Sequence, residues 1–172
     1  MNALYVITKY LTFPGALLRG FWEQSICRLM KIPVENNKYL QTNEMSGHIE
    51  HEFVRKKAGS FWFAFIPGLL VFLAGLVFFT APFVNLFYLE IQGKVIRIWM
   101  YIFLYVALSM FTNIFPSVED AIVMWENYKQ LSVGLKILFA PGAVIMYIGA
   151  FAEKYCITFV TNVLLAAVIL FI

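Results

Sequence analysis

The residues best suited to do chemistry are the chain's two histidines, His48 and His51, which stand three positions apart in the sequence HIEHE. On a helix this spacing would place both imidazoles on one face, at a separation that a metal ion could bridge. A zinc site would also need a third protein ligand and an open position for water. Glu23, Glu119 and Asp120, each at the end of an apolar segment, are the candidates. The alternative interpretation is a solvated, charged loop that binds no metal.

The composition predicts a membrane protein. Of 172 residues, 62% are hydrophobic and 13% are charged, whereas soluble proteins average roughly 45–50% apolar and 25% charged residues. No linker rich in Ser, Gly or Pro divides the chain, so we expect a single domain over residues 1–172. The Lys and Arg residues behind the net charge of +3 flank the apolar segments. This placement indicates a lipid bilayer as partner and argues against nucleic acid.

Long runs without charge define the membrane segments. The longest begins at Ser60 and continues to Leu89 without Asp, Glu, Lys, Arg or His, and a helix needs roughly 20 apolar residues to cross a bilayer. We therefore expect an all-α, polytopic transmembrane helix bundle with about four to five membrane helices. Its elements are a helix at 13–30, a polar loop at 31–59, and spans at 60–89, 98–118, 137–152 and 155–172.

Two charged pairs interrupt this pattern. Glu153 and Lys154 predict a tight helical hairpin between the last two spans, and the competing interpretation is one long tilted helix with the pair buried in the bundle. Arg19 and Glu23 stand four positions apart, on one face of the first helix. In lipid that pair must face protein or a wet cavity, unless the helix lies in the membrane interface.

Basic residues predict the topology. Three cations at 55–57 directly precede the longest span, which is the usual cytoplasmic flank. The loops at 31–59 and 119–136 carry five and two Lys or Arg residues, against two at 90–97. We therefore expect a multi-pass protein of the cell membrane with the two larger loops in the cytoplasm.

Several short motifs follow one another along the chain. They are Phe13-Pro14-Gly15-Ala16-Leu17-Leu18, Cys27-Arg28, Lys31-Ile32-Pro33-Val34, Gly47-His48-Ile49-Glu50-His51-Glu52 and Asn113-Ile114-Phe115-Pro116 followed by Asp120. Their order resembles that of the site-2-protease-like membrane metalloproteases. Those proteins have a Pro-Gly helix that bears HExxH, then a small polar element and further spans, with an Asn-x-x-Pro element whose downstream Asp is the third zinc ligand. The resemblance implies a membrane-embedded zinc peptidase scaffold.

The chain departs from that family at the motif that does the chemistry. HExxH places two imidazoles on one helical face for zinc and a Glu beside them as general base. The corresponding stretch here is Arg19-Gly20-Phe21-Trp22-Glu23-Gln24, which has no histidine and leaves only Glu23 as a candidate base. Asp120 also follows Pro116 one position earlier than the family pattern implies.

Three hypotheses follow, and the missing HExxH favours the first. In it, the chain keeps a metalloprotease-like scaffold, has lost catalysis, and binds a membrane partner or peptide; Arg19 and Glu23 then form a structural ion pair. In another, the chain is a small transporter or channel subunit whose intramembrane charges line a path.

The remaining hypothesis is an active zinc-dependent membrane peptidase with a relocated site. His48, His51 and Asp120 would hold the zinc, and Glu23 or Glu50 would activate the water. Water bound to such a zinc has a pKa of about 7, so a nearby carboxylate could complete peptide hydrolysis.

Overall fold

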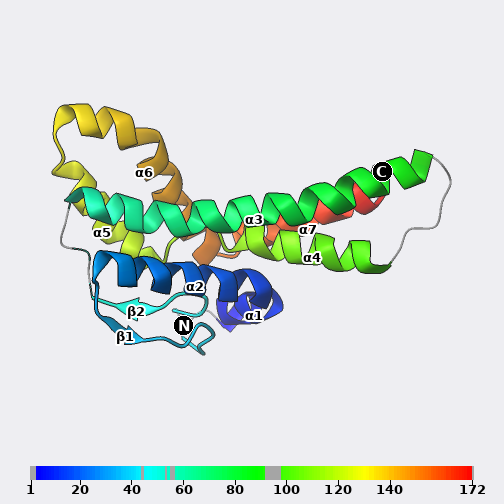
Figure 1. The fold of residues 1–172 in the computed structure, drawn as a ribbon, viewed down its shortest axis with the longest axis horizontal. Coiled ribbons are helices and arrows are strands. Elements are labelled where there is room, and N and C mark those ends of the chain that lie inside the picture. The colour runs from blue at the N-terminus through cyan, green and yellow to red at the C-terminus, as the bar shows by residue number, and fades with distance from the viewer. Residues whose placement is uncertain (1–2, 44, 53, 55–56, 92–97, 172) are drawn as a thin grey trace.

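The computed structural model describes residues 3–43, 45–52, 54, 57–91 and 98–171, and most of these are helical (Figure 1). This confirms the all-α fold class, with one short antiparallel strand pair inside the polar loop. The basic run at 55–57 and the loop at 90–97 fall mostly outside the described residues. The elements in order are α1 (Ala3–Leu11), α2 (Phe13–Met30), β1 (Val34–Asn36), β2 (Glu50–His51), α3 (Lys57–Ile91), α4 (Ile98–Thr112), α5 (Val118–Lys129), α6 (Val133–Lys154) and α7 (Ile157–Phe171).

The longest helix, α3, organises the others. Its 35 residues make it about 52 Å long at about 1.5 Å per residue, which exceeds the roughly 30 Å of bilayer hydrocarbon. α2 packs beside its first half and α4 beside its second half (Figure 1). Within the described part of the chain, two helices are long and apolar enough to cross a membrane, α3 over Lys57–Thr80 and α6 over Val133–Lys154. α4 and α7 are apolar but shorter.

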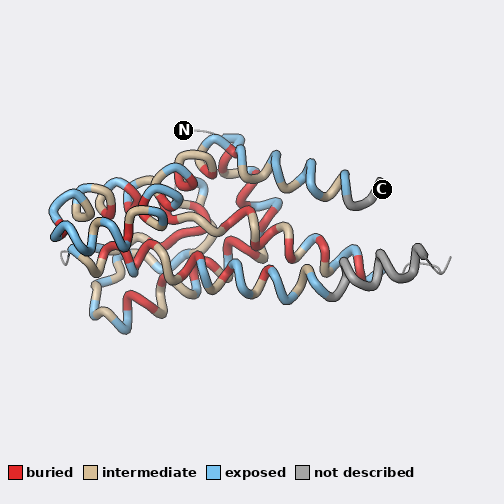
Figure 2. Tube along the Cα trace, turned by 90° about the horizontal axis from the view of Figure 1, so that it is seen from above, coloured by how far each residue is buried: buried red, intermediate tan, exposed pale blue. Residues whose placement is uncertain are grey.

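Three helix boundaries meet in the middle of the molecule, where buried residues concentrate (Figure 2). α1 and α2 join at Thr12, residues 113–117 separate α4 from α5, and Tyr155 and Cys156 separate α6 from α7. Asn113 Nδ2 donates to Thr12 Oγ1 at 3.0 Å and also to the Thr12 carbonyl. The side chain at one boundary thus satisfies the backbone at another, as a low-dielectric interior requires.

The predicted span at 98–118 is interrupted. α4 ends at Thr112, because Pro116 has no N–H to donate and disfavours helical geometry in the residue before it. α5 then restarts at Val118, where Ser117 Oγ caps the helix by accepting from the Asp120 N–H at 3.1 Å. This break places the start of α5 at the interior of the molecule.

The turn expected at Glu153 and Lys154 lies later, at Tyr155 and Cys156. Glu153 is only 4% exposed and forms an ion pair with Lys9, so α6 continues through it into the interior. After the turn, α7 packs beside α4 (Figure 1). Residues 133–171 are therefore two helices joined by a turn, and not one long helix.

The polar loop predicted at 31–59 is shorter in the structure, because α3 begins at Lys57, and an apolar cluster fixes it to the helices. Ile49 is fully buried and Val54 nearly so, and both pack with Cys27 of α2 and Phe63 of α3. Burial of such side chains stabilises the docked loop by roughly 1.5–3 kcal/mol each. The loop's two histidines are positioned by this contact.

Close helix packing predicts a large difference between two glycines. A Cβ at Gly68 would lie 2.2 Å from the Ile114 carbonyl oxygen, whereas a Cβ at Gly134 would meet nothing within 4 Å. We expect Gly68→Ala to destabilise the protein by about 1–3 kcal/mol through overpacking. Gly134→Ala should be neutral or stabilising by up to about 1 kcal/mol. The free energy of unfolding of each variant is measured in mixed detergent micelles. Equal values would show that Gly68 is not packed closely against the Ile114 carbonyl.

Candidate functional site

Among the described residues, five acidic or basic side chains are at most 4% exposed. They come from α1, α2, the polar loop and α6, so the network joins elements from both ends of the chain. We call these residues the buried charge network: Lys9, Arg19, Glu23, His48 and Glu153.

Glu23 is fully engaged by the network. Its Oε1 accepts from Arg19 Nε at 2.7 Å and lies 2.9 Å from His48 Nδ1, and its Oε2 accepts from the Ile49 N–H at 3.3 Å. The ion pair expected from the spacing of Arg19 and Glu23 is therefore present. Glu23 is 1% exposed and lines none of the described cavities. Both carboxylate oxygens therefore have partners inside the protein.

Arg19 also contacts the backbone of two other elements. Its guanidinium also donates to the backbone carbonyl of Ile114 and, at 3.4 Å, to that of Ala64. The first of these carbonyls belongs to the break between α4 and α5, and the second to α3. Arg19 thus satisfies carbonyls of two other elements while it neutralises Glu23.

Lys9 and Glu153 form the other half of the network. They are an ion pair, and Lys9 Nζ also donates to Asn113 Oδ1 at 2.8 Å. Glu153 Oε2 accepts from the Phe115 N–H at 3.1 Å. The pair thus joins α1, the end of α6 and the break between α4 and α5. The sequence gives little indication of this ion pair, because Lys9 is a lone cation in an apolar segment.

His48 connects the two halves. Its Nδ1 contacts Glu23, and its Nε2 lies 3.8 Å from Glu153 Oε1, which is an electrostatic contact longer than a hydrogen bond. Burial alone lowers the pKa of His48, but the two carboxylates outweigh it and raise that pKa above its usual value. The polar loop is thereby attached to α2 and α6 through one imidazole.

His51 lies in a separate contact with Asp120. The His51 Nε2 is 3.3 Å from Asp120 Oδ1, and its Nδ1 donates to the Glu52 carbonyl at 2.8 Å. Asp120 Oδ2 accepts from the Ser117 hydroxyl at 2.7 Å. With acceptors at both ring nitrogens, the imidazolium form of His51 is favoured.

The predicted metal ligands are not brought together as a set of three. His51 meets Asp120, but His48 turns away toward Glu23 and Glu153. The expectation that both imidazoles share a helical face is wrong, because residues 45–48 form a turn and His51 lies in β2. Within the described ranges, no group of three or more His, Cys, Asp or Glu side chains is arranged to hold a metal ion.

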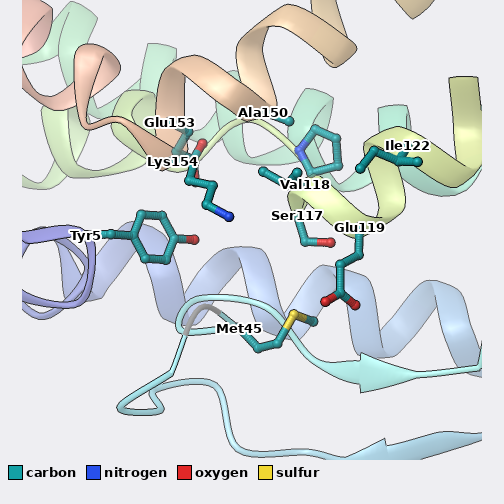
Figure 3. Close-up of a pocket in the computed structure, with 10 residues that line it drawn as sticks. Tyr5, Met45, Ser117, Val118, Glu119, Ile122, Ala150, Glu153 and Lys154 are labelled. Atoms are coloured by element: carbon teal, nitrogen blue, oxygen red, sulfur yellow. The ribbon is translucent and has the colours of Figure 1, made fainter. Parts of the chain in front are cut away.

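Two adjoining cavities open beside the network, and we call them together the acidic cleft. One, of about 260 Å³, lies between the start of α5, the end of α6, Tyr5 and Met45 (Figure 3). The other, of about 520 Å³, includes His51 and Asp120. The cavities share Met45, Ser117 and Glu119, and the larger is also lined by Glu35, Glu50 and Glu52. Glu119 and Glu50, considered as ligand and base from the sequence, thus line the cleft, whereas His48 lines neither cavity.

The His51–Asp120 contact predicts a specific pH dependence. Burial alone lowers the pKa of His51, but the hydrogen bond and charge of Asp120 outweigh it and raise the pKa to about 9. A histidine with a raised folded-state pKa stabilises the fold below its unfolded value of about 6.5, and that contribution is lost as the pH rises through about 9. An NMR titration of the two histidines in detergent should show this pKa, and Asp120→Asn should lower it toward about 6.5. An unchanged pKa in Asp120→Asn would contradict the contact.

Comparison with known proteins assigns no family to this chain. Searches with the chain against protein-family models, curated proteins and solved structures give no match.

Proposed function

We propose that this chain is an integral membrane protein on a site-2-protease-like scaffold that has lost catalysis and binds a membrane partner or peptide. In this proposal four to five helices enter the cell membrane, and the loops at 31–59 and 119–136 face the cytoplasm. The two helices long enough to cross a bilayer support the membrane assignment, and the motif order supports the scaffold.

We infer the loss of catalysis from the hydrogen-bond partners of Glu23. A general base for hydrolysis must reach the attacking water directly or through one water. Glu23 instead uses both oxygens for Arg19, His48 and the Ile49 N–H inside the protein. Where a hydrolase would keep a reactive carboxylate open to substrate, this chain has a closed ion pair that supports the fold.

The acidic cleft is the accessible polar surface next to this closed centre. It lies between the polar loop and the start of α5, both of which we place on the cytoplasmic side. A partner that approaches from that side would contact the cleft, which Glu153 of the network lines but Glu23 does not. We therefore expect binding to depend on the cleft and hydrolysis to be absent.

A peptide-cleavage assay tests the proposal against the alternative of a zinc-dependent peptidase. The purified wild-type protein, reconstituted in lipid with added zinc, is incubated with a peptide mixture derived from membrane proteins, and the fragments are identified by mass spectrometry. We expect no cleavage beyond that of an Asp120→Asn and Glu23→Gln double variant. Cleavage that disappears in the double variant would overturn the loss of catalysis.

A crosslinking experiment tests the binding part. A photo-crosslinking residue at Glu119, which lines the cleft, is compared in native membranes with one at Glu126, which is exposed on α5 outside it. A partner crosslinked only from position 119 should, when purified, bind the wild-type chain and bind Glu119→Lys at least several-fold more weakly. Equal binding to both chains would contradict the cleft as the contact surface.

A transporter or channel subunit is a second candidate function, favoured by one observation. The Lys9–Glu153 pair lies buried at a junction of helix ends, where ion pathways of membrane proteins often use charged side chains. Proton and cation flux into proteoliposomes tests it. Flux that is lost in Glu153→Gln would favour transport over binding.

A further inference from the structure

The first two helices have an inverted arrangement of polar and apolar residues. Between residues 3 and 23 all charged side chains are buried, namely Lys9, Arg19 and Glu23. Every exposed residue in the same stretch is apolar or aromatic. The outward face consists of Ala3, Leu4, Ile7, Tyr10, Leu11, Phe13, Leu17 and Phe21.

This arrangement is the reverse of a helix on a water-soluble protein. A surface helix in water turns its apolar stripe to the core and its charges outward. Here the buried groups of α1 include Thr8 and Lys9, while Leu4, Ile7 and Leu11 are 63%, 54% and 54% exposed. In a bilayer, ionisable residues are expected to face the protein interior and apolar residues the lipid.

The outward face is continuous with the apolar surfaces of two neighbouring helices. The Tyr105 hydroxyl of α4 donates to the Leu11 carbonyl at 2.7 Å, and Leu11 lines a nearly apolar groove together with residues of α4 and α7. α7, which leads to the C-terminus in Figure 2, is exposed along much of its length. Its exposed side chains, such as Val160 and Leu164, are apolar except for Thr161.

The position of the first exposed charged residues after this face also indicates a membrane. Arg28 is the first exposed charged residue after residue 3, and Lys31 follows it at the end of α2. Cations just beyond an apolar segment are typical of the membrane–water boundary. The 18 residues of α2 are about 27 Å long, which nearly matches the hydrocarbon thickness of about 30 Å.

We infer that residues 3–23 are embedded in the bilayer, with their outward face against lipid acyl chains and Arg28 and Lys31 at the water boundary. This inference rests on the proposed membrane assignment and extends it to α1, whose nine residues are too few to cross a bilayer, and to α2, whose apolar sequence is interrupted by the buried Arg19 and Glu23. The buried charge network then lies at membrane depth. α1 and α2 separate it from the lipid, and the polar loop covers Glu23 through His48 and Ile49, whereas Glu153 lines the smaller cavity of the acidic cleft.

Site-directed spin labelling of the full chain in liposomes tests the inference. Single nitroxide labels are placed at Ile7, Leu17 and Phe21, all exposed, so that the labels do not disturb the packing. Val77, 70% exposed on α3, is the lipid reference, and Glu126 on α5 is the water reference. Oxygen, which concentrates in hydrocarbon, and a polar nickel chelate, which is excluded from it, are the two relaxing agents. We expect the three labels to behave as at Val77, with relaxation by oxygen several-fold stronger than by nickel.

The other outcomes separate this inference from the proposed function. Nickel accessibility at the three positions with an oxygen-dominated Val77 would overturn the embedding of α1 and α2 and leave the membrane assignment of α3 intact. Protection from both agents would show that protein covers this face, and would also overturn the inference. Nickel accessibility at Val77 as well would overturn the proposed membrane protein itself.

Discussion

Arg19→Met should be among the most destabilising single substitutions in this chain, at about 3–5 kcal/mol, because it leaves the buried Glu23 carboxylate without its cation. The substitution also removes donors from the Ile114 and Ala64 carbonyls. Equilibrium unfolding in mixed detergent micelles, followed by circular dichroism, gives the free energy of unfolding. The double variant Arg19→Met, Glu23→Gln should recover part of the loss, because no unpaired charge then remains buried.

An exposed ion pair provides the control for the effect of burial. Lys129 pairs with Glu126 at 2.9 Å, and both side chains are more than half exposed. Lys129→Met should therefore change stability by no more than about 1 kcal/mol. Equal effects of Arg19→Met and Lys129→Met would contradict the buried ion pair.

Lys9→Met should have an effect of the same size, about 3–5 kcal/mol, for a related reason. Lys9 neutralises Glu153 and donates to Asn113, so its loss leaves polar groups of α6 and of the break after α4 without their partner. Unfolding in the same micelles measures the effect. A cycle with Glu153→Gln should show a coupling energy of about 0.5–3 kcal/mol.

The control for this prediction is Lys38→Met, since Lys38 is an exposed residue of the polar loop. It should be close to neutral. A Lys9→Met protein as stable as Lys38→Met, with no coupling to Glu153, would show that the two ends of the chain are not joined through this pair.

Local patterns in the sequence were sufficient for the long helices and for one ion pair. The charge-free run at 60–89 predicts α3, because length and hydropathy are properties of a single segment. Arg19 and Glu23 could be paired because an i, i+4 spacing fixes their proximity once a helix forms. Both inferences need no knowledge of what packs against the segment.

The rest of the site depends on contacts between distant segments. Lys9 and Glu153 are 144 positions apart, and no periodicity relates them. The direction of His48 depends on the turn at 45–48 and on the burial of Ile49, which a helical interpretation of HIEHE does not contain. The break after Thr112 also could not be predicted from the sequence. The apolar run continues past the end of α4, and a proline such as Pro116 is tolerated in many membrane helices.

The zinc content of the lipid- or detergent-purified protein tests the central claim, that a closed charge network stands where a hydrolase would have its metal centre. The wild type and a His48→Ala, His51→Ala double variant are reconstituted with zinc, freed of excess metal and measured by mass spectrometry of the element. We expect no more zinc in the wild type than in the variant. Stoichiometric zinc in the wild type that disappears in the variant would contradict it and establish a relocated metal site.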